Sequence, residues 1–210
     1  MIALRWFLSA SVLVVACAAA QAQTLRATTE DGRAVLLDPK GTWKFAPEGA
    51  SEKKVQGAPY NVSPAAKERV AIPNLKAKVA YNEKRWKLLD KPLNQVASLS
   101  FRHANGDSYA MVIAERIEMP LQTLRNAAVE NAKSAAKDLT IEREEHRTVN
   151  GRPVLMLQMS GTLQGIPFVY FNYYHAGPAG AIQFMSYTAR NLFNESKADF
   201  EELLNGLLVE

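Results

Sequence analysis

The sequence predicts an α+β protein, in which an antiparallel β-sheet is flanked by two helices and preceded by a small three-stranded β-meander. Stretches with alternating apolar and polar residues are joined by short turns rich in Gly and Asn, as in antiparallel hairpins. Residues 120–138 and 194–208 instead repeat apolar residues at spacings of three and four, as in amphipathic helices. Apolar residues make up 48% of the chain and charged residues 22%, which is typical of a globular protein.

Residues 1–22 have the pattern of a secretory signal peptide. Arg5 precedes a small and apolar run, Trp6–Ala20, which ends in a small-x-small triplet, Ala20-Gln21-Ala22, that a signal peptidase can cleave. The 15 residues of the run are fewer than the about 20 that a helix needs to cross a membrane. We therefore expect the mature protein to be periplasmic or secreted.

The same leader also fits a second product. Val14-Val15-Ala16-Cys17 matches the pattern in which a cysteine after a small apolar triplet becomes lipidated. Cleavage before Cys17 would give a protein anchored in the cell envelope by acyl chains, each buried CH₂ contributing about 0.8 kcal/mol. Cys17 is the only cysteine of the chain, so the folded part of either product has no disulfide and no cysteine nucleophile.

Residues 23–45 are predicted to form the β-meander. Its three short strands are expected at 25–29, 34–37 and 42–45. About 22 residues bury too little surface to be stable alone, so the meander must dock on the main domain or on a partner. Residues 46–73, which are rich in Pro, Gly and Lys and poor in apolar residues, are expected to be a flexible linker or a loop wrapped on the main domain.

Residues 74–210 are predicted to be the main domain. Its first strands are expected at 79–89, 96–102 and 108–117, and Asn105-Gly106 between the last two is the strongest hairpin signal of the chain. The stretch 108–117 is apolar on both of its faces. We therefore expect this strand to be central and covered on both sides.

The second half of the main domain begins with a helix that Pro120 opens and that runs to about Asp138. Four strands are expected to follow, at 140–149, 153–161, 166–175 and 181–189. A final helix is expected from Asn194 to Leu208. Its buried face would hold Phe200, Leu203, Leu204 and Leu207. Gly206 would weaken the end of this helix by about 1 kcal/mol relative to alanine.

Turn and core residues across 79–208 carry a family resemblance. They are Tyr81, Trp86-Lys87-Leu88, Phe101, Gly106–Ala110, Asn150–Val154, Tyr170, Tyr173-Tyr174, Gly180, Gln183 and Phe200–Leu204. Together with the order of three strands, helix, four strands and helix, these residues resemble the PsbP-like superfamily. The resemblance implies an α/β/α sandwich around an antiparallel sheet. It also implies an accessory protein that binds a larger complex or a regulatory protein, and it supplies no catalytic residue.

The charge of the chain excludes one class of partner. The leader contains a single charged residue, Arg5, so the mature chain has 24 Lys and Arg against 21 Asp and Glu, a net charge of +3. This charge is too small to indicate nucleic-acid binding. Residues 67–91 are locally basic, with eight positive and three negative side chains. This segment suits an acidic partner or an anionic membrane surface, and it equally fits a solvated linker and strand.

The most suggestive cluster for binding is the aromatic stretch 168–175. It contains Phe168, Tyr170, Phe171, Tyr173 and Tyr174, followed by His175. Aromatic side chains with polar tips suit binding surfaces, and a sheet covered on both faces also needs aromatic residues in its core. We expect Phe168, Phe171 and Tyr173 in the core, and we take Tyr170 and Tyr174 as candidate ligand-binding residues.

No metal, cofactor or catalytic site is expected from the sequence. The three histidines, His103, His146 and His175, are far apart in the chain, whereas a zinc site needs clustered ligands. Ser134-Ala135-Ala136-Lys137 matches a Ser-x-x-Lys motif, but it falls near a helix end and lacks the other motifs of that enzyme class.

Together these observations predict an exported, non-enzymatic binding or accessory protein of the bacterial envelope. Its partner would be an unidentified protein or a small envelope ligand. The alternatives are a lipoprotein anchored through Cys17, or a hydrolase whose site has no recognisable motif. A deep pocket that joins His103, Glu115 or Tyr174 would favour a hydrolase.

Overall fold

The computed structural model describes residues 25–28, 34–37, 42–45 and 60–210. The chain divides into two units, Met1–Gln56 and Gly57–Glu210. In the first unit, three strands form an antiparallel sheet in sequence order, as the alternation predicted: β1 (Leu25–Thr28), β2 (Ala34–Leu37) and β3 (Trp43–Phe45). The predicted leader, the meander's turns and the first part of the predicted linker lie outside the described residues.

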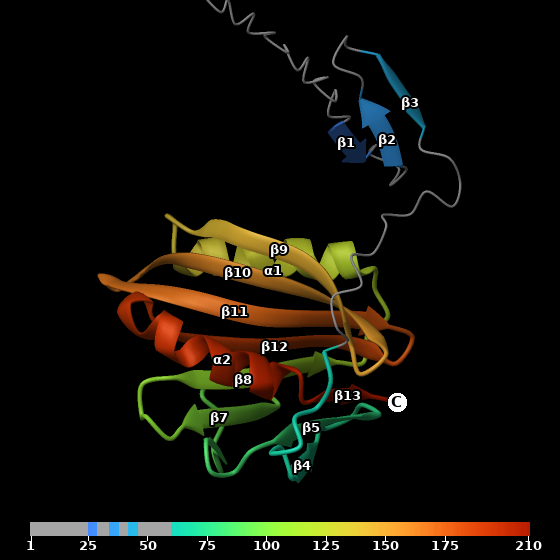
Figure 1. The fold of residues 1–210 in the computed structure, drawn as a ribbon. Helices are drawn as coiled ribbons and strands as arrows, with labels where there is room; N and C mark the ends of the chain where they lie inside the picture. Colours follow the sequence, from blue (N-terminus) through green and yellow to red (C-terminus); the bar gives the residue numbers. More distant parts are fainter. Residues whose placement is uncertain (1–24, 29–33, 38–41, 46–59) are drawn as a thin grey trace, which may run out of the picture. The chain divides into compact units, whose positions relative to one another are not determined.

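The second unit is built on a seven-stranded antiparallel sheet with the strand order β6-β7-β8-β12-β11-β10-β9 (Figure 1). Its strands are β6 (Trp86–Leu88), β7 (Leu99–His103), β8 (Tyr109–Glu115), β9 (Thr140–Val149), β10 (Arg152–Leu163), β11 (Ile166–Gly177) and β12 (Gly180–Ala189). A smaller antiparallel sheet has the order β13-β5-β4, from β4 (Glu68–Ala71), β5 (Ala77–Tyr81) and β13 (Leu207–Val209).

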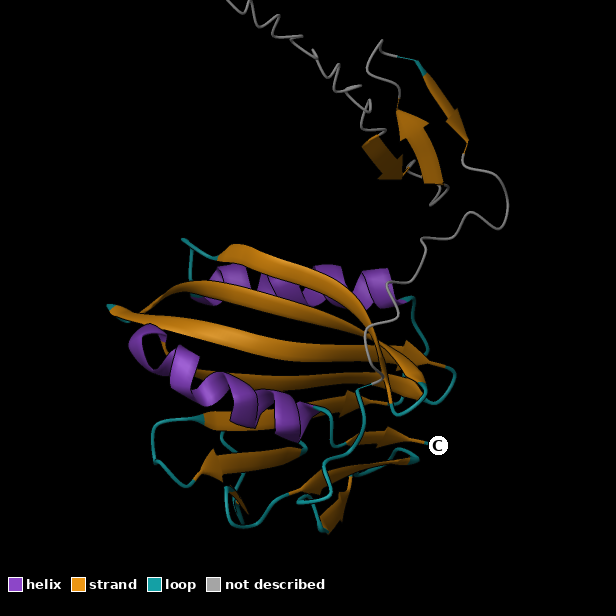
Figure 2. Cartoon of the chain, in the orientation of Figure 1, coloured by secondary structure: helices purple, strands orange, loops and turns teal. Residues whose placement is uncertain are grey.

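Two helices lie on opposite faces of the seven-stranded sheet (Figure 2). α1 (Leu121–Ala135) packs on one face, which we call the α1 face. α2 (Phe193–Leu204), preceded by the 3₁₀ turn Arg190–Leu192, packs on the other, which we call the α2 face. The predicted α+β architecture is therefore confirmed. Among the residues that the structure describes, no helix is both long enough and apolar enough to cross a membrane.

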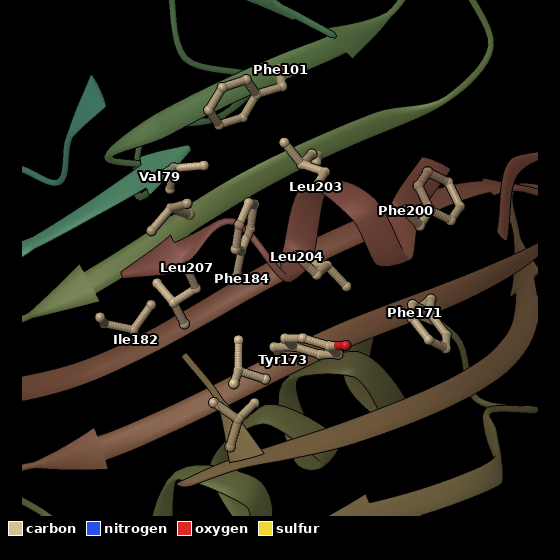
Figure 3. Packing of buried hydrophobic residues seen from close by; sticks show 14 of the residues in the cluster. Val79, Phe101, Phe171, Tyr173, Ile182, Phe184, Phe200, Leu203, Leu204 and Leu207 are labelled. Atoms are coloured by element: carbon tan, nitrogen blue, oxygen red, sulfur yellow. The ribbon is translucent and has the colours of Figure 1, made fainter. Parts of the chain in front are cut away.

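The core has two parts because successive side chains of each strand point to opposite faces. The larger part lies on the α2 face, and the small sheet and α2 close it (Figure 3). Its large side chains include Trp86, Phe101, Phe171, Tyr173, Phe184 and Phe200. The smaller part lies under α1 and includes Leu124, Val129, Leu157, Met159 and Tyr174. The expectation that Phe168, Phe171 and Tyr173 are core residues is confirmed.

Three element boundaries differ from the sequence prediction. The stretch 79–89 is two strands in two sheets, because a turn intervenes in which Arg85 N and Trp86 N both donate to Asn82 O. The predicted linker 46–73 extends too far, since β4 lies within it and pairs with β5. The final helix ends at Leu204, and Leu207 and Leu208 belong to β13 instead.

Arg147 of β9 is a buried cation that joins the sheet to α2. Its Nη1 donates to the Tyr173 hydroxyl at 2.7 Å and to Glu201 Oε1 at 2.6 Å, and its Nη2 donates to Glu145 Oε2 at 3.1 Å. Burial by itself would lower the pKa of Arg147, but Tyr173, Glu145 and Glu201 outweigh it and raise the pKa above its usual value. The two carboxylates thus compensate a charge that would otherwise be costly to bury.

Tyr60 uses the same arginine to hold the start of the second unit. Its ring centroid lies 4.2 Å from the Arg147 guanidinium, which is a cation–π contact. Its backbone pairs with the edge strand β9, since Tyr60 N donates to Thr148 O and Asn150 N donates to Tyr60 O. The chain therefore enters the described part of this unit along the free edge of β9.

Gly206 is required by packing at the junction between α2 and β13. Its carbonyl accepts a hydrogen bond from Ala80 N at 2.8 Å, and a Cβ at this position would overlap the carbonyl oxygen of Ala80. From the sequence, Gly206 was expected to destabilise the end of the final helix. The structure reverses that interpretation, because no side chain fits between the two backbones.

We therefore expect Gly206→Ala to lower the free energy of unfolding by about 1–3 kcal/mol, the usual cost of overpacking. Gly177→Ala is the matched control, since its Cβ would meet only His175 Nε2 at 3.7 Å. The control should stay within about 0.5 kcal/mol of the natural protein. Urea unfolding midpoints measure both effects. Equal midpoints for the two variants would contradict the packing argument.

Candidate functional site

A single row of side chains crosses four strands on the α1 face. The strand registers place Arg102 of β7 opposite Tyr109 of β8, Tyr109 opposite Tyr187 of β12, and Tyr187 opposite Tyr170 of β11. The ring centroids of Tyr109 and Tyr187 are 5.7 Å apart and stacked, and those of Tyr187 and Tyr170 are 5.8 Å apart and edge-on. We call Tyr109, Tyr187 and Tyr170 the tyrosine row.

The tyrosine row extends from the α1 cluster, against which Tyr170 packs, to the part of this face that α1 does not cover. Among the described residues, α1 packs on β10 and β11 and reaches β12 at Ala181, and it does not extend behind β8 (Figure 1). All three tyrosines are half-buried, as are Ile113 and Met185 beside them. β8 is central in the sheet, as its sequence predicted. Both of its faces are covered at Ala110–Val112, where all three side chains are buried, and only Tyr109 and Ile113 on the α1 face are half-buried.

The hairpin between β7 and β8 fixes the basic end of the row. The Gly106 carbonyl accepts from Arg102 Nε at 3.3 Å, from Arg102 Nη2 at 3.2 Å and from the Tyr109 hydroxyl at 2.9 Å. Gly106 has φ 86°, a left-handed conformation that glycine adopts at little cost, and the Asn105-Gly106 pair predicted this turn. One carbonyl therefore holds the arginine and the first tyrosine side by side.

A hollow of about 360 Å³ adjoins this end of the row. It is lined by Glu83, Arg85, Lys87, Arg102, His103, Ala104 and Gly106. Lys87 of β6 lies directly opposite Arg102, which extends the row by one strand. Arg85 pairs with Asp199, whereas Lys87 and Arg102 form no ion pair with any residue that the structure describes. The hollow is therefore cationic.

The charges of the basic segment 67–91 are divided between paired and unpaired side chains. Lys78 pairs with Glu210 at 2.9 Å, and Arg69 donates to backbone carbonyls of the preceding turn. Only the C-terminal part of the segment reaches the hollow, through Arg85 and Lys87. Two of the eight positive side chains of this segment therefore line the hollow, together with Glu83.

Tyr170 and Tyr174, the two candidate residues from the sequence, occupy different environments. Tyr170 belongs to the tyrosine row. Tyr174 has 0% of its surface exposed and packs between the sheet and α1, where its hydroxyl accepts from Asn172 Nδ2 at 3.0 Å. Burial raises the pKa of Tyr174 to about 12. A ligand on the surface does not reach Tyr174, so only Tyr170 remains part of the candidate site.

The residues considered for catalysis do not come together. His103 lines the hollow, with its Nε2 3.0 Å from Asp199 Oδ2, but neither Glu115 nor Tyr174 lines it. The Ser134 hydroxyl donates to the Glu130 carbonyl at 2.9 Å, within α1. Across the described residues, no group of three or more His, Cys, Asp or Glu side chains could hold a metal ion.

The row also perturbs the ionisation of its own tyrosines. Burial raises the pKa of Tyr170 above its ordinary value. Burial, together with the neighbouring Tyr170 and Tyr109, raises the pKa of Tyr187 to about 12. When folding raises the pKa of a phenol, the group stabilises the folded state. This stabilisation is complete below the unfolded pKa of about 10, and it is lost as pH rises toward the pKa of the folded state.

We expect Tyr187→Phe to remove one tyrosine from the late phase of an alkaline titration followed by tyrosinate absorbance. The variant should also lose less stability than the natural protein between pH 10 and about 12, the interval that the raised pKa of Tyr187 defines. Tyr109→Phe keeps Tyr187 and removes one of the neighbours that raise its pKa, so the late phase should keep its amplitude and move to lower pH. An unchanged late phase in Tyr187→Phe would contradict this assignment.

Comparison with known proteins identifies the fold. No protein-family model and no curated protein matches the chain. Cyanobacterial PsbP (CyanoP) from Synechocystis sp. PCC 6803 superimposes with a TM-score of 0.52 at 15% identity, covering 74% of this chain and 99% of that one. The chain therefore has a PsbP-like fold, as its resemblance to that superfamily implied.

Two further solved structures are similar at lower scores. A protein of unknown function from Pseudomonas aeruginosa, described as a putative regulator, has a TM-score of 0.44 at 9% identity and covers 68% of this chain and 96% of its own. LpqN of Mycobacterium tuberculosis, described as involved in cell envelope biogenesis, has a TM-score of 0.41 at 10% identity and covers 71% and 96%.

Proposed function

We propose that this protein is an extracytoplasmic, non-enzymatic accessory protein that binds a partner through the tyrosine row. The observation that carries the proposal is the row itself, three half-buried tyrosines of which Tyr187 contacts the other two. The signal-peptide pattern of residues 1–22 supports a location outside the cytoplasm.

The composition of the open face supports binding. Tyr, Met and Arg are enriched in the energetically important centres of protein interfaces, and this face combines the tyrosine row with Met185 and Arg102. Tyrosine offers a large contact area with few side-chain torsions, so little entropy is lost when a partner fixes it. Scattered apolar residues need no explanation, whereas a contiguous row that spans three strands favours an interaction site.

The shape of the site favours a macromolecular partner over a small envelope ligand. Small-molecule sites are concave and bury about 70–90% of their ligand. The hollow lies at the basic end of the row, and its lining includes none of the three tyrosines. A small ligand over the row would stay largely exposed, whereas a second protein surface would cover it.

The non-enzymatic part of the proposal rests on the chemistry of the hollow. Its lining contains three cations, a carboxylate and His103, but no hydroxyl or thiol side chain that could act as a nucleophile. His103 Nδ1 accepts from the Asn105 backbone N–H at 3.2 Å, so that nitrogen is already engaged. These contacts suit the binding of an acidic group.

Photocrosslinking tests the proposed binding face. A photoreactive residue at Met185, beside the row, should give one discrete crosslinked species in an envelope extract. The same residue at Ala198, exposed on α2, should not. Tyr187→Ala should reduce that product at least about tenfold, as truncation of an interface centre does. Equal products from both positions, or a product insensitive to Tyr187, would rule out this face.

The mature N-terminus decides between the soluble protein and the lipoprotein anchored through Cys17. The signal-peptide pattern supports cleavage after Ala22, so mass spectrometry of the exported protein should find an unmodified N-terminal Gln23. An acylated Cys17 would instead show the membrane-anchored form. A Cys17→Ala variant is the control, because it should leave the first product unchanged and abolish the second.

A further inference from the structure

The charges at the end of the row indicate what kind of partner fits it, if the proposed function holds. We propose that the partner is a protein segment that presents a carboxylate to the hollow and an aromatic or aliphatic surface to the tyrosine row. The inference concerns the chemistry of the partner, whereas the proposed function concerns only the face that binds it.

Two cations in the hollow lack an acidic partner. Lys87 and Arg102 face each other across β6 and β7, and neither forms an ion pair with the described residues. Glu83 is the only carboxylate in the lining. Asp199, which could have compensated the site, is already held by Arg85 and lies 3.0 Å from His103. A carboxylate from outside would supply the missing negative charge.

Arg102 is positioned in advance for such a group. Its Nε and Nη2 donate to the Gly106 carbonyl, and no residue that the structure describes accepts from Nη1. The guanidinium also lies over the Tyr109 ring, 5.9 Å from its centroid. These contacts fix the planar group before binding, so that less conformational entropy is lost when a carboxylate accepts from Nη1.

The length of the site matches a short peptide segment. Lys87, Arg102, Tyr109, Tyr187 and Tyr170 stand on five adjacent strands, which are separated by four spacings. At about 4.8 Å per spacing the row is about 19 Å long, the length of about six extended residues. One acidic side chain at the hollow and two or three apolar side chains beyond it would therefore occupy the whole row.

A membrane surface is the competing occupant, because lipid phosphates would also suit Lys87 and Arg102. Residues that enter a bilayer interface project from the surface so that their apolar parts sit below the headgroups. The three tyrosines are half-buried within the sheet, with their rings packed against one another. This arrangement favours contact with a complementary protein surface, and the membrane becomes an outcome of the test.

Selection from a phage library of random dodecapeptides tests the inference on the intact protein. We expect the natural protein to enrich peptides that combine Asp or Glu with aromatic or aliphatic residues. The double variant Lys87→Glu/Arg102→Glu should lose these peptides and enrich Lys and Arg instead. Lys76→Glu/Lys197→Glu is the matched control, because it changes the net charge equally at exposed or half-exposed positions outside the hollow and the row.

The affinity of the best acidic peptide should fall at least about tenfold in the Lys87→Glu/Arg102→Glu variant and stay unchanged in the control. The inference would be overturned if the natural protein enriched neutral or basic peptides. It would also be overturned if the charge-reversed variant enriched the same acidic peptides. So would binding of phosphatidylglycerol vesicles, but not phosphatidylcholine vesicles, that requires Lys87 and Arg102 and displaces the peptide.

The Tyr187→Ala variant separates this inference from the proposed function. Acidic peptides that bind equally well without Tyr187 would refute the tyrosine row as the binding face while leaving the cationic hollow as the site of recognition. Peptides that require Tyr187 but show no preference for acidic residues would refute only the inference. The absence of any enriched peptide would refute both.

Discussion

The central sheet is wider than one helix, and this difference determines how each face of the sheet is covered. Seven strands at about 4.8 Å spacing span about 29 Å, whereas one helix with its side chains is only about 10–12 Å wide. On one face α2 and the three-stranded sheet β13-β5-β4 together provide enough cover. On the other face α1 packs mainly on β10 and β11 and reaches β12 at Ala181, and the loop that contains Leu93 and Asn94 contacts β7 and β8. Part of β8 and β12 therefore has no helix over it. Tyr109 and Tyr187 lie in this part, and Tyr170 lies beside it, against the α1 cluster.

Two arginines of this domain differ in how their positive charge is compensated. Arg147 is withdrawn from solvent, and Glu145 and Glu201 compensate its charge while Tyr60 and Tyr173 pack against it. Arg102 is exposed, and two neutral groups orient it, the Gly106 carbonyl and the Tyr109 ring. The first arrangement satisfies the charge internally, so it contributes to cohesion of the domain. The second orients the charge and leaves it uncompensated, which is the condition for recognising an anion.

Much of the fold was predictable because it depends on local patterns. The four strands after α1 and the Asn105-Gly106 turn follow from alternation and from a glycine at positive φ. The split of 79–89 between two sheets was not predictable, because both parts have the same alternation and only tertiary pairing separates them.

The candidate site was predictable only in part, for a related reason. Tyr170 stood out within an aromatic stretch, but Tyr109 and Tyr187 stand alone in their strands. They join Tyr170 only because β12 pairs with β8, a strand that precedes it by more than sixty residues. The attachment of Tyr60 to the β9 edge has a related consequence. Tyr60 lies at the β9 margin of the sheet, and the cationic hollow opens at the opposite margin, about 29 Å away. The hollow and the contact between Tyr60 and β9 are therefore separated by the full width of the sheet.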